Sequence, residues 1–279
     1  MILGIDIGGT KIKYALFDKS LNTIESGEVQ SYAICGAKVL LENLFDLIDK
    51  FKFDGLGVST AGIVGKSGEI VYANDNIPNY TGVKLKEILQ TRYGVPVVVL
   101  NDIDACAICE YYYSKCDDFY FIALGTGVGG AFVKDGKIVK GNSSFAGQIG
   151  YLNTSCGDTV DNAVSTRGLE KISGVDGKRL FEMVKFGDTV ARQNLLKWVK
   201  ELANLIKMVV GFFSPSKIVL GGAICSQGDF LVDIIKSECD KFPLPYNDSF
   251  VLTTATKENL SGALGSVIAL INNGEKVYE

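Results

Sequence analysis

The chain has 279 residues, of which 47% are hydrophobic and 22% are charged, and its formal net charge is −4. This composition is typical of a globular enzyme, and without a basic block it argues against nucleic acid as a partner. The longest apolar stretches are too short to span a bilayer, and no leader pattern precedes the first strand, so we expect a cytoplasmic protein without a membrane partner.

Histidine is absent from the sequence. This absence excludes Ser-His and Cys-His nucleophile pairs and histidine-bound zinc, so proton transfer must use carboxylates, lysine, tyrosine or water. The seven cysteines follow no disulfide framework, and we expect reduced thiols.

The first half of the chain alternates apolar strand patterns with segments of helical spacing. Its first three strands follow one another closely, and each later strand is flanked by a helix. The pattern predicts strands at 1–7, 12–17 and 23–30, a helix at 38–50, a strand at 55–60, a helix at 84–93, a strand at 95–102 and a helix directly after it.

The second half begins in the same way, with a strand, a glycine turn and another strand. An irregular section from about 142 to 178 interrupts the pattern. The sequence predicts strands at 119–125, 131–135 and 137–141, helices at 179–186 and 190–213, a strand at 217–222, a helix at 230–241, a strand at 249–255 and a helix at 260–272.

Each half opens with a glycine turn between two strands. Gly8 and Gly9 have no side chains, so an anion can approach the turn closely, with Thr10 and Lys11 beside it. Asp6 stands where a carboxylate could hold a metal ion that bridges phosphates. A lone turn of this kind is equally well explained by a plain β-hairpin, but the second turn at 126–130 favours phosphate binding.

The repeated pattern predicts a duplicated α/β architecture with ligands at the carboxyl ends of the strands. We expect an N-terminal domain at 1–105, on which the helix near 260–273 packs back, and a larger domain at 106–259. Candidate residues follow five strands: Asp6, Gly8 and Gly9; Ser59 and Thr60; Asn101 and Asp102; Gly125, Thr126 and Gly127; Gly221 and Gly222.

Five motifs in this order resemble the ROK family (repressor, open reading frame, kinase) of sugar kinases. The resemblance covers essentially the whole chain and implies the two-domain actin/hexokinase-like fold, a duplicated ribonuclease-H-like fold with a cleft between the domains. The motifs are DIGGTK at 6–11, NIPNY at 76–80, VLNDIDACAICE at 99–110, LGTGVGGA at 124–131 and SPSKIVLGGAI at 214–224.

The resemblance implies transfer of the ATP γ-phosphoryl group to a sugar hydroxyl, usually the 6-hydroxyl of a hexose, by a homodimer. Asp102 would be the general base. Asp6 would hold Mg²⁺, directly or through water. ATP would be bound by Gly8, Gly9, Thr10, Lys11, Gly125, Thr126, Gly127, Gly129, Gly221 and Gly222.

The sequence departs from the family at its zinc motif, Glu-x-Gly-His followed by C-x-C-G-x-x-G-C-x-E. Gln148 and Tyr151 replace the glutamate and the histidine, and Cys156 alone remains of the cysteines. A structural zinc needs about four nitrogen or sulfur ligands, so we predict none here. Asp161 aligns best with the second family glutamate, and Glu170 is the competing candidate. The implied sugar-binding set is Asn76, Asn101, Asp102, Gln148, Tyr151 and Asp161, with Asn79 as a further contact.

Zinc-less family members that resemble this chain include N-acetylmannosamine kinases and β-glucoside kinase-like proteins, which favours a modified hexose over glucose. Two alternatives stay open. A sugar-responsive repressor would carry a helix-turn-helix before DIGGTK, where five residues precede Asp6. A catalytically inactive sugar sensor would explain the lost Glu-x-Gly-His motif, but such a sensor would not need the two glycine turns that could bind phosphate.

Overall fold

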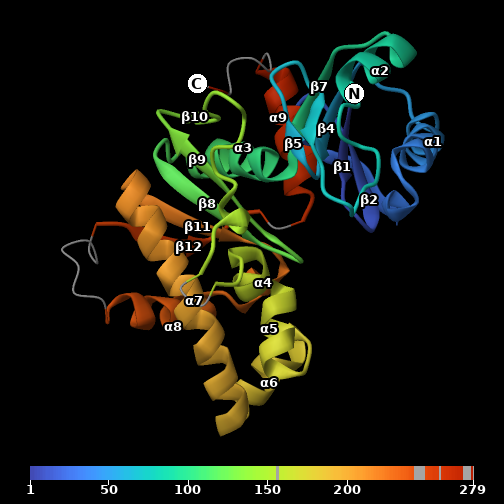
Figure 1. Ribbon diagram of the computed structural model, residues 1–279. Coiled ribbons are helices and arrows are strands. Elements are labelled where there is room, and N and C mark those ends of the chain that lie inside the picture. Colours follow the sequence, from blue (N-terminus) through green and yellow to red (C-terminus); the bar gives the residue numbers. More distant parts are fainter. Residues whose placement is uncertain (155–156, 242–248, 258, 273–277, 279) are drawn as a thin grey trace. The chain divides into compact units, whose positions relative to one another are not determined.

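The computed structural model describes residues 1–154, 157–241, 249–257, 259–272 and 278, which form two compact units. Unit 1 comprises Met1–Lys115, Gly136–Ala146 and Asn259–Glu279, and unit 2 comprises Cys116–Asp135 and Gly147–Glu258. The boundary predicted between residues 105 and 106 falls inside a helix that belongs to unit 1. The elements carry the labels of Figure 1.

Unit 1 is built on a five-stranded sheet with the order β3-β2-β1-β4-β7. Strand β1 pairs antiparallel with β2 and parallel with β4, which pairs parallel with β7. The elements of this unit are β1 (Ile2–Ile7), β2 (Lys11–Phe17), β3 (Thr23–Gln30), α1 (Ala37–Ile48), β4 (Gly55–Thr60), β5 (Ile63–Val64), β6 (Ile70–Tyr72), α2 (Leu85–Tyr93), β7 (Val97–Asn101), α3 (Asp102–Ser114), β10 (Lys137–Ile138), α9 (Ser261–Ile271) and a 3₁₀ turn at Ala33–Cys35.

The core of unit 1 follows from the apolar patterns of its elements. Every residue of β4 is buried, as expected for a strand covered on both faces. Helix α1 buries Leu40, Leu44 and Leu47, which recur at helical spacing, against the same core.

Helix α9 packs closely against α3 and against strands β1 and β4, and Figure 1 shows it (red) beside α3 (green). Glycines make this approach possible. A Cβ at Gly265 would lie 1.8 Å from the backbone oxygen of Ala105, and one at Gly57 would lie 2.6 Å from the backbone carbon of Ser266. The packing therefore depends on positions without side chains.

The second sheet has the order β10-β9-β8-β11-β12, the same sequence of pairings as in the first sheet. Strand β8 pairs antiparallel with β9 and parallel with β11, which pairs parallel with β12. Unit 2 contains β8 (Phe119–Leu124), β9 (Val128–Lys134), α4 (Val160–Val164), α5 (Thr166–Ser173), α6 (Gly177–Lys185), α7 (Thr189–Phe213), β11 (Lys217–Gly221), α8 (Asp229–Cys239), β12 (Val251–Thr254) and 3₁₀ turns at Ile149–Tyr151 and Ala223–Gln227.

The core of unit 2 centres on the long helix α7. Trp198 is fully buried there, and its indole N–H donates a hydrogen bond of 2.9 Å to the backbone oxygen of Val164. Because a buried indole needs such a partner, this bond ties α7 to α4.

The matching strand orders confirm the duplicated α/β fold. Two segments differ from the sequence-based expectation. The section from 142 to 178 contains the short helices α4 and α5, whose first turns are capped by Thr159 and Ser165. Residues 63–72 form the two-stranded sheet of β5 and β6, which the sequence pattern did not indicate.

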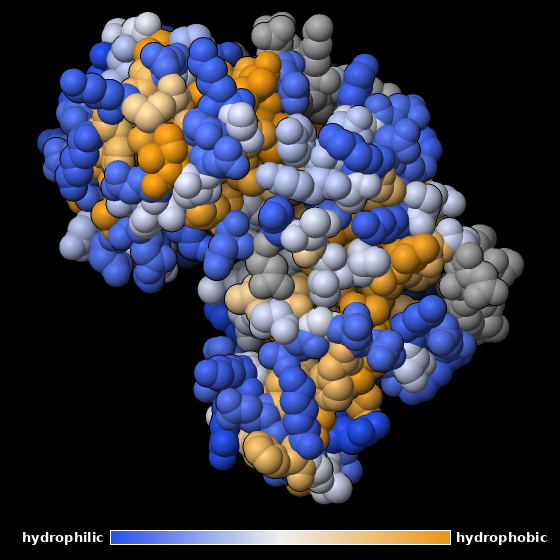
Figure 2. All heavy atoms as spheres, turned by 180° about the vertical axis from the view of Figure 1, so that it is seen from behind, coloured by the Kyte–Doolittle hydropathy of each residue, from blue (hydrophilic) through white to orange (hydrophobic). Residues whose placement is uncertain are grey.

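The face seen in Figure 2 carries hydrophilic residues with hydrophobic patches between them. Single exposed hydrophobic side chains are normal on globular proteins. Within the part of the chain that the structure describes, no helix is both long and apolar enough to cross a bilayer.

We expect Gly265→Ala to lower the free energy of unfolding of the protein by about 1–3 kcal/mol, because the methyl group would push α9 away from α3. Urea unfolding followed by circular dichroism measures this change. The matched control is Gly211→Ala in α7, where an added Cβ meets no atom within 4 Å. That exposed helical position should gain up to about 1 kcal/mol. Equal effects of the two variants would contradict the packing argument.

Candidate functional site

Three parallel strands of unit 1 end at one edge of the first sheet. The register places Asp6 of β1 opposite Ser59 of β4, and Thr60 of β4 opposite Asn101 of β7. Because carboxyl ends of parallel strands meet at the same edge, polar side chains that are distant in sequence gather there.

Asp6 is held at this edge by Ser59, whose hydroxyl donates a hydrogen bond of 2.7 Å to Oδ1 of the carboxylate. Burial raises the pKa of Asp6, while the hydrogen bond from Ser59 and the charge of Lys13 lower it. A buried carboxylate of this kind is stabilised by a nearby cation.

Asn101 caps helix α3 and holds the neighbouring Asp102. Its Oδ1 accepts hydrogen bonds from the N–H groups of Ile103 at 3.0 Å and Asp104 at 3.3 Å. Its Nδ2 donates to the backbone oxygen of Gly62 and to Oδ1 of Asp102, both at 2.8 Å. The amide therefore fixes both the first turn of the helix and the orientation of the carboxylate.

Asp102 is the first residue of α3, and its side chain is partly buried. Burial raises its pKa to about 7, and the charges of Asp6 and Asp104 act in the same direction. The backbone N–H of Ile103 partly offsets this by donating to Oδ1 at 3.0 Å. A carboxylate with such a pKa accepts a proton far more readily than an ordinary aspartate at neutral pH.

The turn after β1 is exposed, and its backbone is closed by a hydrogen bond of 2.9 Å from the N–H of Gly8 to the oxygen of Lys11. Neither Gly8 nor Gly9 has a φ in the left-handed region, so backbone strain does not explain these glycines. A Cβ at Gly9 would meet no atom within 4 Å, which leaves open space beside the turn. The Lys11 ammonium forms an ion pair with Glu28 of β3.

The NIPNY segment at 76–80 is anchored beneath the same strand ends. Tyr80 is buried, and its hydroxyl lies 3.0 Å from Oγ1 of Thr60. Asn76 and Asn79 are exposed on this loop, and Asn79 has a φ of 60°. The anchor therefore presents two amide side chains to solvent.

In unit 2, the glycine turn after β8 is braced by residues of α4 and α5. Oδ1 of Asp161 accepts a hydrogen bond of 2.6 Å from the N–H of Val128, and the guanidinium of Arg167 donates to the oxygen of Thr126 at 2.7 Å. Arg167 also pairs with Asp161 at 3.2 Å. The hydroxyl of Thr166 donates to the oxygen of Gly125 at 2.8 Å.

This brace explains why the turn needs a glycine in its centre. A Cβ at Gly127 would lie 2.6 Å from Oδ1 of Asp161. Gly125 begins the turn, and its N–H donates to the oxygen of Gly127 at 2.9 Å, whereas Gly129 lies just beyond the turn, in β9. Asp161 thus holds the turn with Oδ1 and pairs with Arg167 through Oδ2.

The remaining candidates of unit 2 lie in the segment that follows β9. Gln148 is half-buried and precedes the 3₁₀ turn that contains Tyr151, whose side chain is exposed. Glu170 is exposed on α5. Cys156 lies outside the described residues.

Gly221 and Gly222 stand at the end of β11, where the chain passes close to β8. Gly222 has a φ of 106°, and a Cβ there would lie 2.1 Å from the backbone oxygen of Leu124. Only glycine suits both conditions.

Several polar residues of the site were not singled out from the sequence. Thr166 and Arg167 act through contacts with segments far away in the chain, and no local pattern marks them. Tyr80 belongs to the NIPNY motif, but the motif does not indicate its contact with Thr60. No disulfide joins the cysteines that the structure describes, and among the residues with described positions no group of three His, Cys, Asp or Glu side chains could hold a metal ion.

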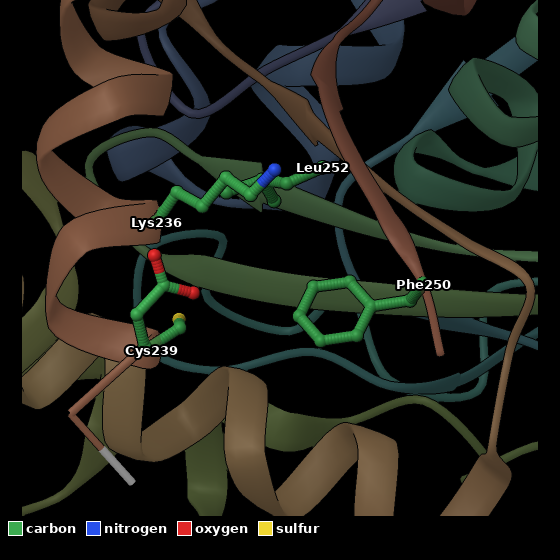
Figure 3. Close-up of a pocket in the computed structure, with 5 residues that line it drawn as sticks. Lys236, Cys239, Phe250 and Leu252 are labelled. Carbon is green, nitrogen blue, oxygen red and sulfur yellow. The ribbon is translucent and has the colours of Figure 1, made fainter. Parts of the chain in front are cut away.

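A small pocket of unit 2 lies between α8 and β12 (Figure 3). It is lined by Lys236, Cys239, Asp240, Phe250 and Leu252, none of which is a candidate site residue. In Figure 3, Lys236 and Cys239 come from α8 and Leu252 from β12, and Phe250 lies directly before that strand. We assign this pocket no function.

Comparison with known proteins places these features in a family. The chain is 28% identical to the N-acetylmannosamine kinase of Salmonella heidelberg over 98% of both chains. It is 25% identical to the β-glucoside kinase of Listeria monocytogenes, over 95% of this chain and 96% of the relative. In fold it resembles a ROK family glucokinase from Streptomyces griseus, with a TM-score of 0.80 at 22% identity, over 95% of this chain and 97% of that one. The family model described as ROK family matches residues 2–273, and the chain therefore belongs to the ROK family.

Proposed function

We propose that the protein is an ATP-dependent sugar kinase that transfers the γ-phosphoryl group to a hexose or N-acylhexosamine hydroxyl. The observation that carries this proposal is Asp102, a partly buried carboxylate that Asn101 holds at the start of α3. A carboxylate base is the expected solution in a chain without histidine.

Asp102 acts as the general base in this mechanism. It accepts the proton of the sugar hydroxyl while the hydroxyl oxygen bonds to the γ-phosphorus, and the bond from that phosphorus to the leaving oxygen of ADP breaks. Phosphoryl transfer is largely dissociative, so the base mainly orients the nucleophile. Asn101 keeps the Asp102 carboxylate in place. Its Nδ2 donates to Gly62 and to Asp102, and a contact with a sugar hydroxyl would replace one of these two hydrogen bonds.

The glycine turns bind the phosphates of ATP. Open space at Gly9 suits a phosphate in the first turn, and Lys11 can leave Glu28 to contact it. In the second turn, Asp161 and Arg167 hold the backbone, and Gly221 and Gly222 lie against the adenosine. The whole proposed set is Gly8, Gly9, Thr10, Lys11, Gly125, Thr126, Gly127, Gly129, Gly221 and Gly222.

Asp6 is the residue that would hold Mg²⁺, directly or through water. Magnesium in such sites takes one or two carboxylates together with phosphate oxygens and water, which fits a single carboxylate fixed by Ser59. When bound, the ion neutralises charge on the transferring phosphates.

The sugar is bound by Asn76, Gln148, Tyr151 and Asp161 together with Asn101 and Asp102. Gln148 offers an uncharged donor and acceptor, and Tyr151 offers a hydroxyl and an aromatic face. Asp161 would have to share its carboxylate with the turn that it braces. The kinase names of the relatives and these two replacements support N-acetylmannosamine or another modified hexose as substrate, in a homodimer as the family resemblance implies.

A sugar panel tests the proposed activity. We expect ADP release from Mg-ATP with one or few of glucose, mannose, fructose, N-acetylglucosamine, N-acetylmannosamine and a β-glucoside. Reactions without sugar correct for ATP hydrolysis. Sugar binding without ADP release across the panel would contradict the kinase proposal and support an inactive sugar sensor.

We expect Asp102→Asn to lower kcat by about 10²–10⁴-fold, because the amide cannot accept the proton, while the sugar Kd changes little. Steady-state kinetics and titration calorimetry measure the two quantities. The control is Asp46→Asn, which changes an exposed carboxylate on α1 and should keep the kcat of the unmodified protein. If turnover survives in Asp102→Asn, the base assignment is wrong.

The raised pKa of Asp102 predicts a pH dependence. The base must be ionised, so kcat/KM should fall as pH drops below about 7, by about tenfold per unit, and level off above it. Direct chromatography of ADP avoids coupling enzymes that have pH profiles of their own, and circular dichroism checks that the protein stays folded. A flat profile from about pH 5.5 to about pH 8 would exclude this titration.

A further inference from the structure

Unit 1 contains a buried ion pair that the mechanism above does not use. Asp104 of α3 pairs with Lys140, and their side chains are only 5% and 6% exposed. The Tyr278 hydroxyl hydrogen-bonds the same carboxylate, and the Lys140 ammonium lies 5.4 Å from the centre of the Tyr278 ring. Tyr278 is itself tied to Ile138 by a parallel bridge.

Asp104 lies in the same helical turn as Asp102. Its backbone N–H donates to the cap residue Asn101, which also holds the Asp102 carboxylate. The first turn of α3 is therefore fastened at two points. The cap fastens its backbone, and Lys140 and Tyr278 fasten a side chain two residues beyond Asp102.

Burying this pair is costly, because two charges lose their hydration and the pair contributes little net stability. A buried pair of apolar residues would serve packing equally well at this position. The cost is consistent with a geometric role rather than a stabilising one.

We propose that Asp104, Lys140 and Tyr278 form a positioning cluster that fixes the first turn of α3, and with it the direction of the Asp102 carboxylate. Lys140 and Tyr278 are positioning residues and touch no substrate. The catalytic part of this inference rests on the proposed kinase activity, whereas the fixing of the helix turn does not.

The test compares three variants. Lys140→Met leaves a buried carboxylate unpaired and can unfold the protein. Asp104→Asn combined with Lys140→Met removes both charges and should restore thermal stability. Lys140→Arg keeps the pair. Lys84→Met, which breaks the exposed ion pair with Glu87 on α2, is the control.

A positioning role predicts that the double variant is folded yet has a kcat about 10- to 100-fold below that of the unmodified protein, with KM values for sugar and ATP within about twofold. Lys140→Arg should recover most of the kcat, and Lys84→Met should change nothing. If the double variant regains both stability and full kcat, the cluster is merely structural and the inference is overturned.

Hydrogen exchange gives a readout that does not depend on activity. The N–H groups of Ile103 and Asp104 should exchange about tenfold faster or more in the double variant, while the amides of α2 stay unchanged. Unchanged exchange at the first turn of α3 would overturn the inference even if the protein is a kinase. Faster exchange in a protein without kinase activity would refute the proposed function alone.

Discussion

Parallel pairing of β1, β4 and β7 is the constraint on which the candidate site depends. Because these strands run in the same direction and in register, their carboxyl ends bring Asp6, Ser59 and Asn101 to one edge of the first sheet. Helix α3 begins where β7 ends, so Asp102 joins them without a loop. The close packing of α9 on β4 and α3, through glycines, holds the strand ends and this helix together.

The same edge concentrates negative charge in a shielded place. Asp6, Asp102 and Asp104 all have raised pKa values, chiefly because of burial. Such an arrangement costs stability, and functional sites are where proteins retain it. Ser59 donates a hydrogen bond to Asp6, Asn101 donates one to Asp102, and Lys140 forms an ion pair with Asp104. Each carboxylate therefore has its own partner, which fixes its direction.

The sequence predicted the strands of both five-stranded sheets, the two glycine turns and the strand-end residues, because alternating apolar runs and glycine turns are local signals. It did not predict α4 and α5, whose buried residues Val160, Val164 and Leu169 lie in one hydrophobic cluster with residues of α7. Nor did it indicate the brace of Asp161 and Arg167 on the second turn or the pairing of Asp104 with Lys140, because these contacts join segments that no local pattern connects. The glycines of the first turn were expected to let an anion approach because they lack side chains, and the structure has open space at Gly9.

Phosphorus NMR of the reaction with Mg-ATP and the preferred sugar tests the central claim most directly. The account predicts a new phosphomonoester signal coupled to two methylene protons, as expected for a phosphoryl group on the 6-oxygen of a hexose. Inorganic phosphate as the sole new signal beside ADP would mean that water, and not the sugar, takes the phosphoryl group, and would contradict the account.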